Sequence, residues 1–181
     1  MKAFANWLMG TFARRYDYDV SYMGEYAEAS PGGFLRYLFA APFSQYQKRA
    51  PKHVYFVAKV VSTRRSDCGP CLRLVYNMAK EAGVDETVLR AALQDDVTAL
   101  NDRNQAEEVD LAIRYAKAVL DHDLIAVAEV GEAILSRWGR PTLNEIAGAI
   151  AFGQFFPTFK RGLLHAQACE PVLAELIANP G

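Results

Sequence analysis

The apolar residues of the chain recur mainly at intervals of three and four positions, the spacing of helices that bury one face. The clearest apolar stripe begins at Cys68 and continues through Cys71, Val75, Met78 and Ala82. Gly83 follows directly and is a typical helix-ending residue. The second half of the chain contains no run of regular alternation, which a half-buried strand would show. The pattern therefore predicts an all-α fold of about eight helices joined by short connections.

Proline, glycine and capping residues divide the chain into the predicted elements. Helices are expected over 3–15, 68–82, 86–94, 105–121, 123–138, 143–156 and 171–179, and the apolar pattern also resumes over 34–46. Residues 52–65 predict either a helix or, because of a β-branched run, a buried strand. Residues 30–33 (Ser-Pro-Gly-Gly) predict a break, and Asp123 is a candidate cap. Thr142 and Glu145 have the spacing of a capping box at the start of helix 143–156.

The size of the chain favours a single helical domain over residues 1–181. Its 20 basic and 21 acidic residues leave a net charge of −1, which argues against a nucleic acid or an anionic membrane as partner. The longest uncharged stretch, 146–159, is shorter than the roughly 20 residues of a membrane-spanning helix. Three cysteines are an odd number, unlike a secreted disulfide scaffold. We therefore expect a cytoplasmic protein.

One motif carries chemistry: Cys68-Gly69-Pro70-Cys71. Ser66 or Asp67 is the predicted N-cap, which would place both cysteines in the first turns of one helix. The N–H groups and positive dipole at a helix N-terminus favour a thiolate, so the pKa of Cys68 should fall below its ordinary value. Cys71 is then the natural resolving thiol. Asp67 is a further candidate as proton acceptor, although capping is its expected role.

Two features of the composition surround this motif. No acidic residue occurs between Glu28 and Asp67, whereas seven basic residues do. Positive charges near the cysteines would stabilise a thiolate further. The basic residues of this tract are Arg36, Lys48, Arg49, Lys52, Lys59, Arg64 and Arg65. A solvated basic face is the simpler interpretation of each. Tyrosine and phenylalanine are concentrated before residue 60 (13 of 19), where they could line an apolar ligand pocket or an oligomer interface.

The segment 66–71 (Ser-Asp-Cys-Gly-Pro-Cys) and the helix that ends near Gly83 resemble the alkylhydroperoxidase D-like, or carboxymuconolactone decarboxylase-like, family. The resemblance covers about residues 50–160 and leaves 1–49 as an N-terminal helical extension. It includes 112–116 (Ala-Ile-Arg-Tyr-Ala) and 143–146 (Leu-Asn-Glu-Ile). The resemblance implies a compact all-helical subunit that assembles into homo-oligomers. In the redox members of the family, the two cysteines reduce peroxide or exchange disulfides.

Peroxidatic members of this family carry a histidine four residues after the second cysteine and a glutamate about a dozen residues before the first. Here Val75 stands at the histidine position, and the glutamate position falls near Phe56. His53, His122 and His165 are the only histidines that could act instead. We therefore expect an oxidoreductase that cycles Cys68 and Cys71 between dithiol and disulfide, with weak antioxidant peroxidase activity at most. Its expected partners are a peroxide or disulfide substrate and a thiol reductant.

Three points remain open on sequence alone. Either cysteine could be the one that attacks the substrate. A structural zinc site could form from Cys68, Cys71, His165 and Cys169, because the last two residues have helical ligand spacing. A non-redox member of the family, a decarboxylase-type enzyme or a ligand-binding scaffold, is the main alternative function. No organic cofactor is expected, because no glycine-rich phosphate loop occurs.

Overall fold

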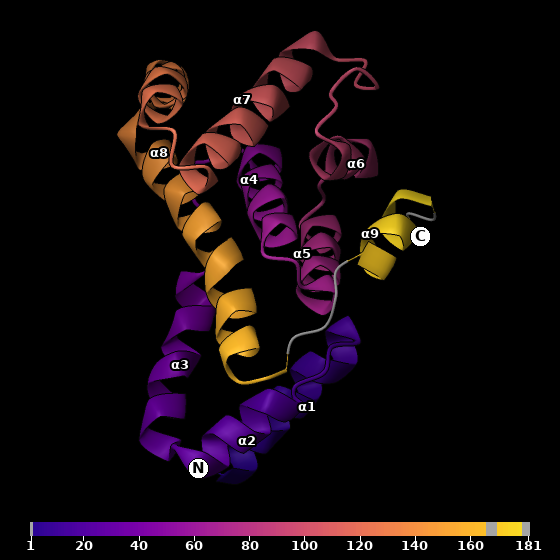
Figure 1. Cartoon of the computed structure of the whole chain (residues 1–181), viewed down its shortest axis with the longest axis vertical. Helices are drawn as coiled ribbons and strands as arrows, with labels where there is room; N and C mark the ends of the chain where they lie inside the picture. Colours follow the sequence, from indigo (N-terminus) through magenta and orange to yellow (C-terminus); the bar gives the residue numbers. More distant parts are fainter. Residues whose placement is uncertain (1, 166–169, 179–181) are drawn as a thin grey trace.

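The computed structural model describes residues 2–165 and 170–178 (Figure 1), and every regular element in these residues is a helix. The predicted all-α fold is therefore confirmed. The helices in chain order are α1 (Lys2–Tyr16), α2 (Ser21–Ala29), α3 (Pro31–Phe43), α4 (Lys52–Arg65), α5 (Gly69–Glu81), α6 (Glu86–Gln94), α7 (Arg103–Leu120), α8 (Leu124–Gly162) and α9 (Glu170–Ala178). None of these helices is both long enough and apolar enough to cross a membrane.

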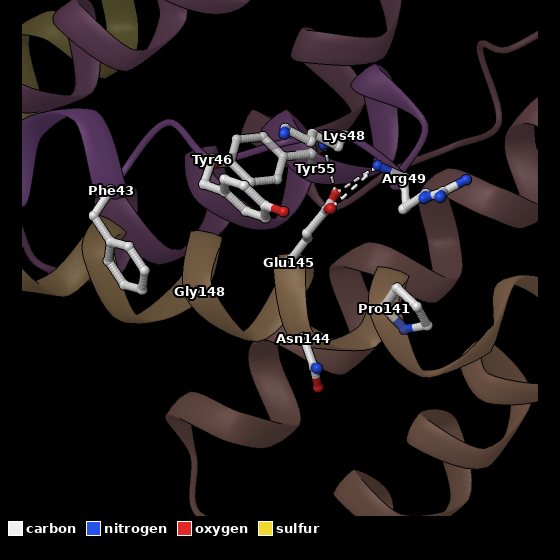
Figure 2. A pocket seen from close by; sticks show the side chains of 9 residues that line it. All are labelled: Phe43, Tyr46, Lys48, Arg49, Tyr55, Pro141, Asn144, Glu145 and Gly148. Atoms are coloured by element: carbon white, nitrogen blue, oxygen red, sulfur yellow. Dashed lines mark hydrogen bonds between the residues drawn. The ribbon is translucent and has the colours of Figure 1, made fainter.

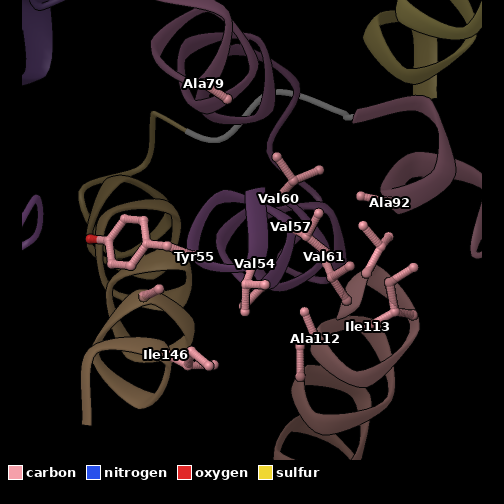
Figure 3. Packing of buried hydrophobic residues seen from close by; sticks show 14 of the residues in the cluster. Val54, Tyr55, Val57, Val60, Val61, Ala79, Ala92, Ala112, Ile113 and Ile146 are labelled. Carbon is pink, nitrogen blue, oxygen red and sulfur yellow. The ribbon is translucent and has the colours of Figure 1, made fainter. Parts of the chain in front are cut away.

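Helix α4 lies at the centre of the molecule. It packs against α5, α6, α7 and α8, which surround it in the end-on view of Figure 3. Nine of its fourteen residues are buried, including the β-branched run that made a strand conceivable. Because neighbours cover α4 on nearly every side, its sequence lacks the polar face of a surface helix. The open choice between helix and strand at 52–65 is thereby settled as helix.

Two predicted boundaries are wrong. The break expected at 30–33 is limited to Ser30, because Pro31 occupies the first turn of α3, where its fixed φ suits a helix. The predicted helices 123–138 and 143–156 correspond to the two parts of α8, which meet at a kink at Gly139, but the second part continues past 156 to Gly162. Only Gly139 departs from helical geometry there (φ 78°, ψ 174°), a conformation that glycine adopts without strain. The predicted cap at Asp123 is confirmed, since its carboxylate accepts from the N–H groups of Ile125 and Ala126.

Glu145 does not act as the predicted capping-box residue. Its buried carboxylate instead accepts hydrogen bonds from the backbone N–H groups of Lys48, Arg49 and Ala50, at 2.9 to 3.1 Å (Figure 2). These groups precede α4 and have no helical carbonyl to bond to. Glu145 thus attaches the α3–α4 connection to α8. Burial opposes ionisation, but the hydrogen bonds from the backbone outweigh it and lower the pKa of Glu145.

The crossing of α4 and α8 depends on a glycine. A Cβ at Gly153 would lie 2.7 Å from the Cβ and Oγ of Ser62 and 3.0 Å from the carbonyl oxygen of Lys59. The Ser62 hydroxyl donates to the carbonyl oxygen of Ile150 at 2.6 Å, a hydrogen bond that joins the two helices at this crossing. The close approach brings the C-terminal end of α8 beside the turn between α4 and α5.

Replacing this glycine should separate the two helices. Gly153→Ala is expected to lower the free energy of unfolding by about 1–3 kcal/mol, because the added methyl group overpacks the crossing. Gly148→Ala, on the same helix with no atom within 4 Å of the added Cβ, should be neutral or stabilising by up to about 1 kcal/mol. Urea denaturation measures both changes. Equal stability of the two variants would contradict the account of the crossing.

The Glu145 carboxylate should stabilise the fold in a pH-dependent way. Glu145→Gln is expected to cost about 1–3 kcal/mol at pH 7, because an amide cannot accept all of these hydrogen bonds. A carboxyl group whose pKa is lowered by folding stabilises above its unfolded pKa of about 4.3 and loses this contribution as the pH falls through the folded value. The difference from wild type in urea denaturation should therefore shrink below pH 4. The control is Glu132→Gln on the exposed face of α8, and an equal cost for both variants would refute the assigned role.

Candidate functional site

The two cysteines lie at the start of α5, directly after the turn that follows α4. Cys68 is itself the N-cap, with extended backbone (φ −132°, ψ 97°), so the predicted N-caps Ser66 and Asp67 are wrong. Ser66 instead ends α4 as its C-cap. Asp67 is exposed and adopts a left-handed conformation (φ 50°), which aspartate tolerates better than most residues. Asp67 thus reverses the chain between the helices and remains adjacent to Cys68.

The sulfur atoms of Cys68 and Cys71 lie 2.8 Å apart and are hydrogen-bonded as free thiols. Both residues are buried, at 3% exposure each. The hydrogen bond between the two sulfurs lowers the pKa of Cys68 to about 6, and the backbone N–H of Cys71 acts in the same direction. The pKa of Cys71 is raised by the same hydrogen bond and by burial. The expected low pKa of Cys68 is therefore found, with the partner thiol as its largest cause.

The positive charges at this site come from the end of α8. Lys160 and Arg161 both contribute to the low pKa of Cys68. Arg161 donates to the carbonyl oxygen of Ser66, which holds it against the turn before the cysteines. Lys160 is 1% exposed, and its Nζ atom makes no hydrogen bond to any of the described residues. Its ammonium instead lies over aromatic rings, 4.9 Å from the centroid of Tyr18 and 5.2 Å from that of Tyr22.

A chain of buried tyrosine hydroxyls extends from Cys71. The Oη atom of Tyr18 lies 3.5 Å from the sulfur of Cys71, and Tyr22 links Tyr18 to Tyr37 at 3.5 and 3.2 Å. Burial, reinforced by the neighbouring ionisable groups, raises the pKa of all three tyrosines. They remain protonated at any physiological pH and can act as hydrogen-bond donors. The segment before α4 thus supplies the polar lining of the site.

A cavity of about 450 Å³ opens beside Cys71. Its walls come from α1 to α5, the turns next to them and α8, and most of the lining side chains are apolar. The lining includes Phe12, Tyr18, Tyr22, Tyr37, Lys59, Cys71, Val75 and Phe156. Cys68 is not among the lining residues. Aromatic side chains from before residue 60 therefore line an apolar pocket, one of the two roles that the sequence suggested for them.

The other sequence-derived candidates lie apart from the sulfur atoms. Of the seven basic residues between Glu28 and Asp67, only Lys59 lines the cavity; Arg64 pairs with Asp95 and Arg65 with Asp121. Among the histidines, His53 bonds to Glu108 at 2.7 Å. His165 bonds to Glu25 at 2.9 Å, and its ring centroid is 6.1 Å from that of Tyr22. His122 is exposed in the turn before α8. Lys160 and Arg161 were missed because the sequence does not show which helix end meets the cysteines.

The described residues do not form the zinc site that the sequence left open. Cys169 lies outside them, and within residues 2–165 and 170–178 no three metal-binding side chains gather. A second pocket, of about 550 Å³, lies between Phe43, Tyr46 and Glu145 (Figure 2). The Glu145 carboxylate in its wall is already occupied by backbone N–H groups, so this pocket offers no comparable chemistry.

Comparison with models of protein families, with curated proteins and with solved structures finds no match for this chain. The resemblance described above therefore remains a prediction from the motif and its flanking residues. The site must be interpreted from its own chemistry: a hydrogen-bonded thiol pair, a buried ammonium, three tyrosine hydroxyls and an apolar cavity.

The Lys160 ammonium should contribute to thiol ionisation, beside the larger effect of the partner thiol. Lys160→Met is expected to raise the pKa of Cys68 by about one unit, because it removes a nearby positive charge from a buried site. The pH dependence of alkylation by iodoacetamide measures this pKa directly. Lys117→Met, on the surface of α7, should leave the profile unchanged. An unaltered profile in Lys160→Met would show that the partner thiol and the helix terminus suffice.

Proposed function

We propose that this protein is a thiol–disulfide oxidoreductase that cycles Cys68 and Cys71 between dithiol and disulfide, reducing a hydroperoxide or a disulfide held in the adjoining cavity. The observation that carries the proposal is the sulfur pair itself: two buried free thiols, 2.8 Å apart, with the first pKa lowered to about 6. A thiolate at neutral pH beside a second thiol is the arrangement that thiol–disulfide exchange requires. A purely structural cysteine needs neither feature.

Access favours Cys71 as the attacking sulfur, since it lines the cavity and Cys68 does not. The pair loses one proton near pH 6 and holds the other in the hydrogen bond between the sulfurs. Transfer of that proton from Cys71 to Cys68 would place the thiolate in the cavity. Lys160 acts on both sulfurs and so favours the thiolate at either position. Cys68 would thus take the place of the absent relay histidine.

The reaction with a hydroperoxide then balances as follows. The Cys71 thiolate forms a bond to the outer peroxide oxygen, the O–O bond breaks, and the leaving alkoxide takes up a proton. Tyr18, whose hydroxyl lies 3.5 Å from the Cys71 sulfur, is placed to donate that proton and to regain one from water. The Cys68 sulfur next attacks the Cys71 sulfenic acid: the S–S bond forms, the S–O bond breaks, and the departing hydroxide takes the Cys68 proton to become water. The products are an alcohol, water and a Cys68–Cys71 disulfide, which an external thiol reductant returns to the dithiol.

The apolar cavity also supports a second candidate function, that of a non-redox scaffold that only binds a ligand. In that case the cysteines would be buried core residues, and their substitution would leave binding intact. The helix α3 exposes large apolar side chains at Leu35, Phe39 and Phe43, spaced as one helix face. This face is compatible with the homo-oligomer that the family resemblance implies.

Substitution of each cysteine should separate the two functions. In reduced wild-type protein, tert-butyl hydroperoxide is expected to oxidise both thiols of the pair to a disulfide. The loss of free thiols, measured by titration, follows this reaction. Cys68→Ser should stop at a sulfenic acid on Cys71, which dimedone traps, because the resolving thiol is absent. Cys71→Ser should slow peroxide consumption at least about hundredfold, because it removes the nucleophile.

Cys169→Ser is the matched control and should behave as wild type. A disulfide probe, bis(2-hydroxyethyl) disulfide, tests the exchange reaction with the same variants. If neither Cys68→Ser nor Cys71→Ser changes the consumption of either probe, the redox proposal fails and the ligand-binding scaffold takes its place. A sulfenic acid trapped in Cys71→Ser and absent from Cys68→Ser would instead reverse the assigned order of attack.

A further inference from the structure

The cavity beside Cys71 has one feature that the dithiol chemistry does not use: the ammonium of Lys59 in its wall. Lys59 is 3% exposed and projects from the middle of α4. Its Nζ atom donates to the carbonyl oxygen of Ser44 at 2.6 Å and lies 5.6 Å from the ring centroid of Tyr55. An ammonium group can donate three hydrogen bonds, so this arrangement leaves part of its capacity unused.

Among the described residues, no carboxylate pairs with the charge of Lys59. Within residues 2–165 and 170–178 it enters no ion pair, and its recorded partners are a neutral carbonyl and a ring face. Burial lowers the pKa of Lys59 to about 8, so the group is still mostly protonated at neutral pH. Ser44 ends α3, and the partial negative charge at a helix C-terminus compensates only about half of a unit charge. A buried cation of this kind is costly unless an anion joins it.

The cavity offers space for such an anion together with an apolar chain. Its volume of about 450 Å³ lies in the range of small-molecule sites, and its lining is dominated by aromatic and aliphatic side chains. Lys160, the other buried ammonium nearby, differs from Lys59 because its charge acts on both sulfurs and it does not line the cavity. The two cations therefore divide their roles: the charge of Lys160 acts on the sulfurs, and Lys59 lines the cavity.

We propose that the cavity binds an aliphatic carboxylate, with the carboxylate on the ammonium of Lys59 and the chain against the aromatic wall that leads to Cys71. This inference specifies the substrate class of the proposed redox function. Only the reaction at Cys71 rests on that function. The substrate would be an aliphatic acid that carries a hydroperoxide or a disulfide group. Its carboxylate would bind to Lys59, and its chain would place the reactive group beside the Cys71 sulfur. Binding itself requires no thiol chemistry.

The test compares dodecanoate with 1-dodecanol, which has the same chain without the charge, by isothermal titration calorimetry at pH 7. Wild-type protein should bind dodecanoate more tightly than dodecanol. Lys59→Met should weaken dodecanoate binding about tenfold to hundredfold, as expected for loss of a hydrogen-bonded charge partner in a buried site. Dodecanol should still bind Lys59→Met as it binds wild type, which also shows that the cavity of the variant remains formed.

Lys52→Met is the matched control. Lys52 lies on the same helix and likewise donates to the carbonyl at a helix end, that of Ala82 at 3.1 Å, but it is exposed and outside the cavity. It should keep the preference for dodecanoate. The inference is overturned if wild type binds neither probe, or if Lys59→Met retains the wild-type ratio of the two affinities; Lys59 would then serve only to cap α3. Cys68→Ser should bind dodecanoate normally, so a failure of the redox proposal leaves this result standing.

Discussion

The burial of α4 on nearly all sides is the constraint on which the rest of the structure depends. A helix enclosed by α5, α6, α7 and α8 must satisfy its buried polar groups without water (Figure 3). Ser62 bonds to α8, Lys59 bonds to the end of α3, and Thr63 bonds back to the carbonyl of Lys59. The first two contacts join α4 to its neighbours in addition to the packing of its valines. They also place the turn after α4, and with it the two cysteines, against the end of α8.

The same dry interior gives the candidate site its chemistry. In a low-dielectric environment a positive charge acts strongly on a thiol, because little water screens it. Lys160 lies over tyrosine rings and has no hydrogen-bond partner in the described part of the chain, so the Cys68 thiolate is its natural counter-charge. Arg161 binds the turn that carries Cys68. The glycine at 153 matters to this arrangement because it allows the close approach of α4 and α8 that brings the end of α8 there.

Much of the fold follows from periodicity, whereas the site follows only in part. The helices after residue 68 were predicted nearly to their ends, since their apolar stripes and the cap at Asp123 act locally. Glu145 has the local pattern of a capping box, yet its carboxylate bonds instead to distant backbone N–H groups before α4, which have no helical carbonyl as partner. The cysteine motif could be recognised from the sequence alone. Lys160, 89 or more residues away from both cysteines, was not, because only the packed structure brings that charge to the sulfurs.

The central claim is that Cys68 and Cys71 form a working redox couple and not a pair of core residues. The most direct measurement is the reduction potential of the pair, from equilibration of the intact protein with defined ratios of oxidised and reduced dithiothreitol or glutathione. A stabilised thiolate favours the reduced form, so the account predicts a single two-electron transition between about −270 and −120 mV, the range of catalytic dithiols. Failure to form a Cys68–Cys71 disulfide, or a potential below about −300 mV as in structural disulfides, would contradict the account.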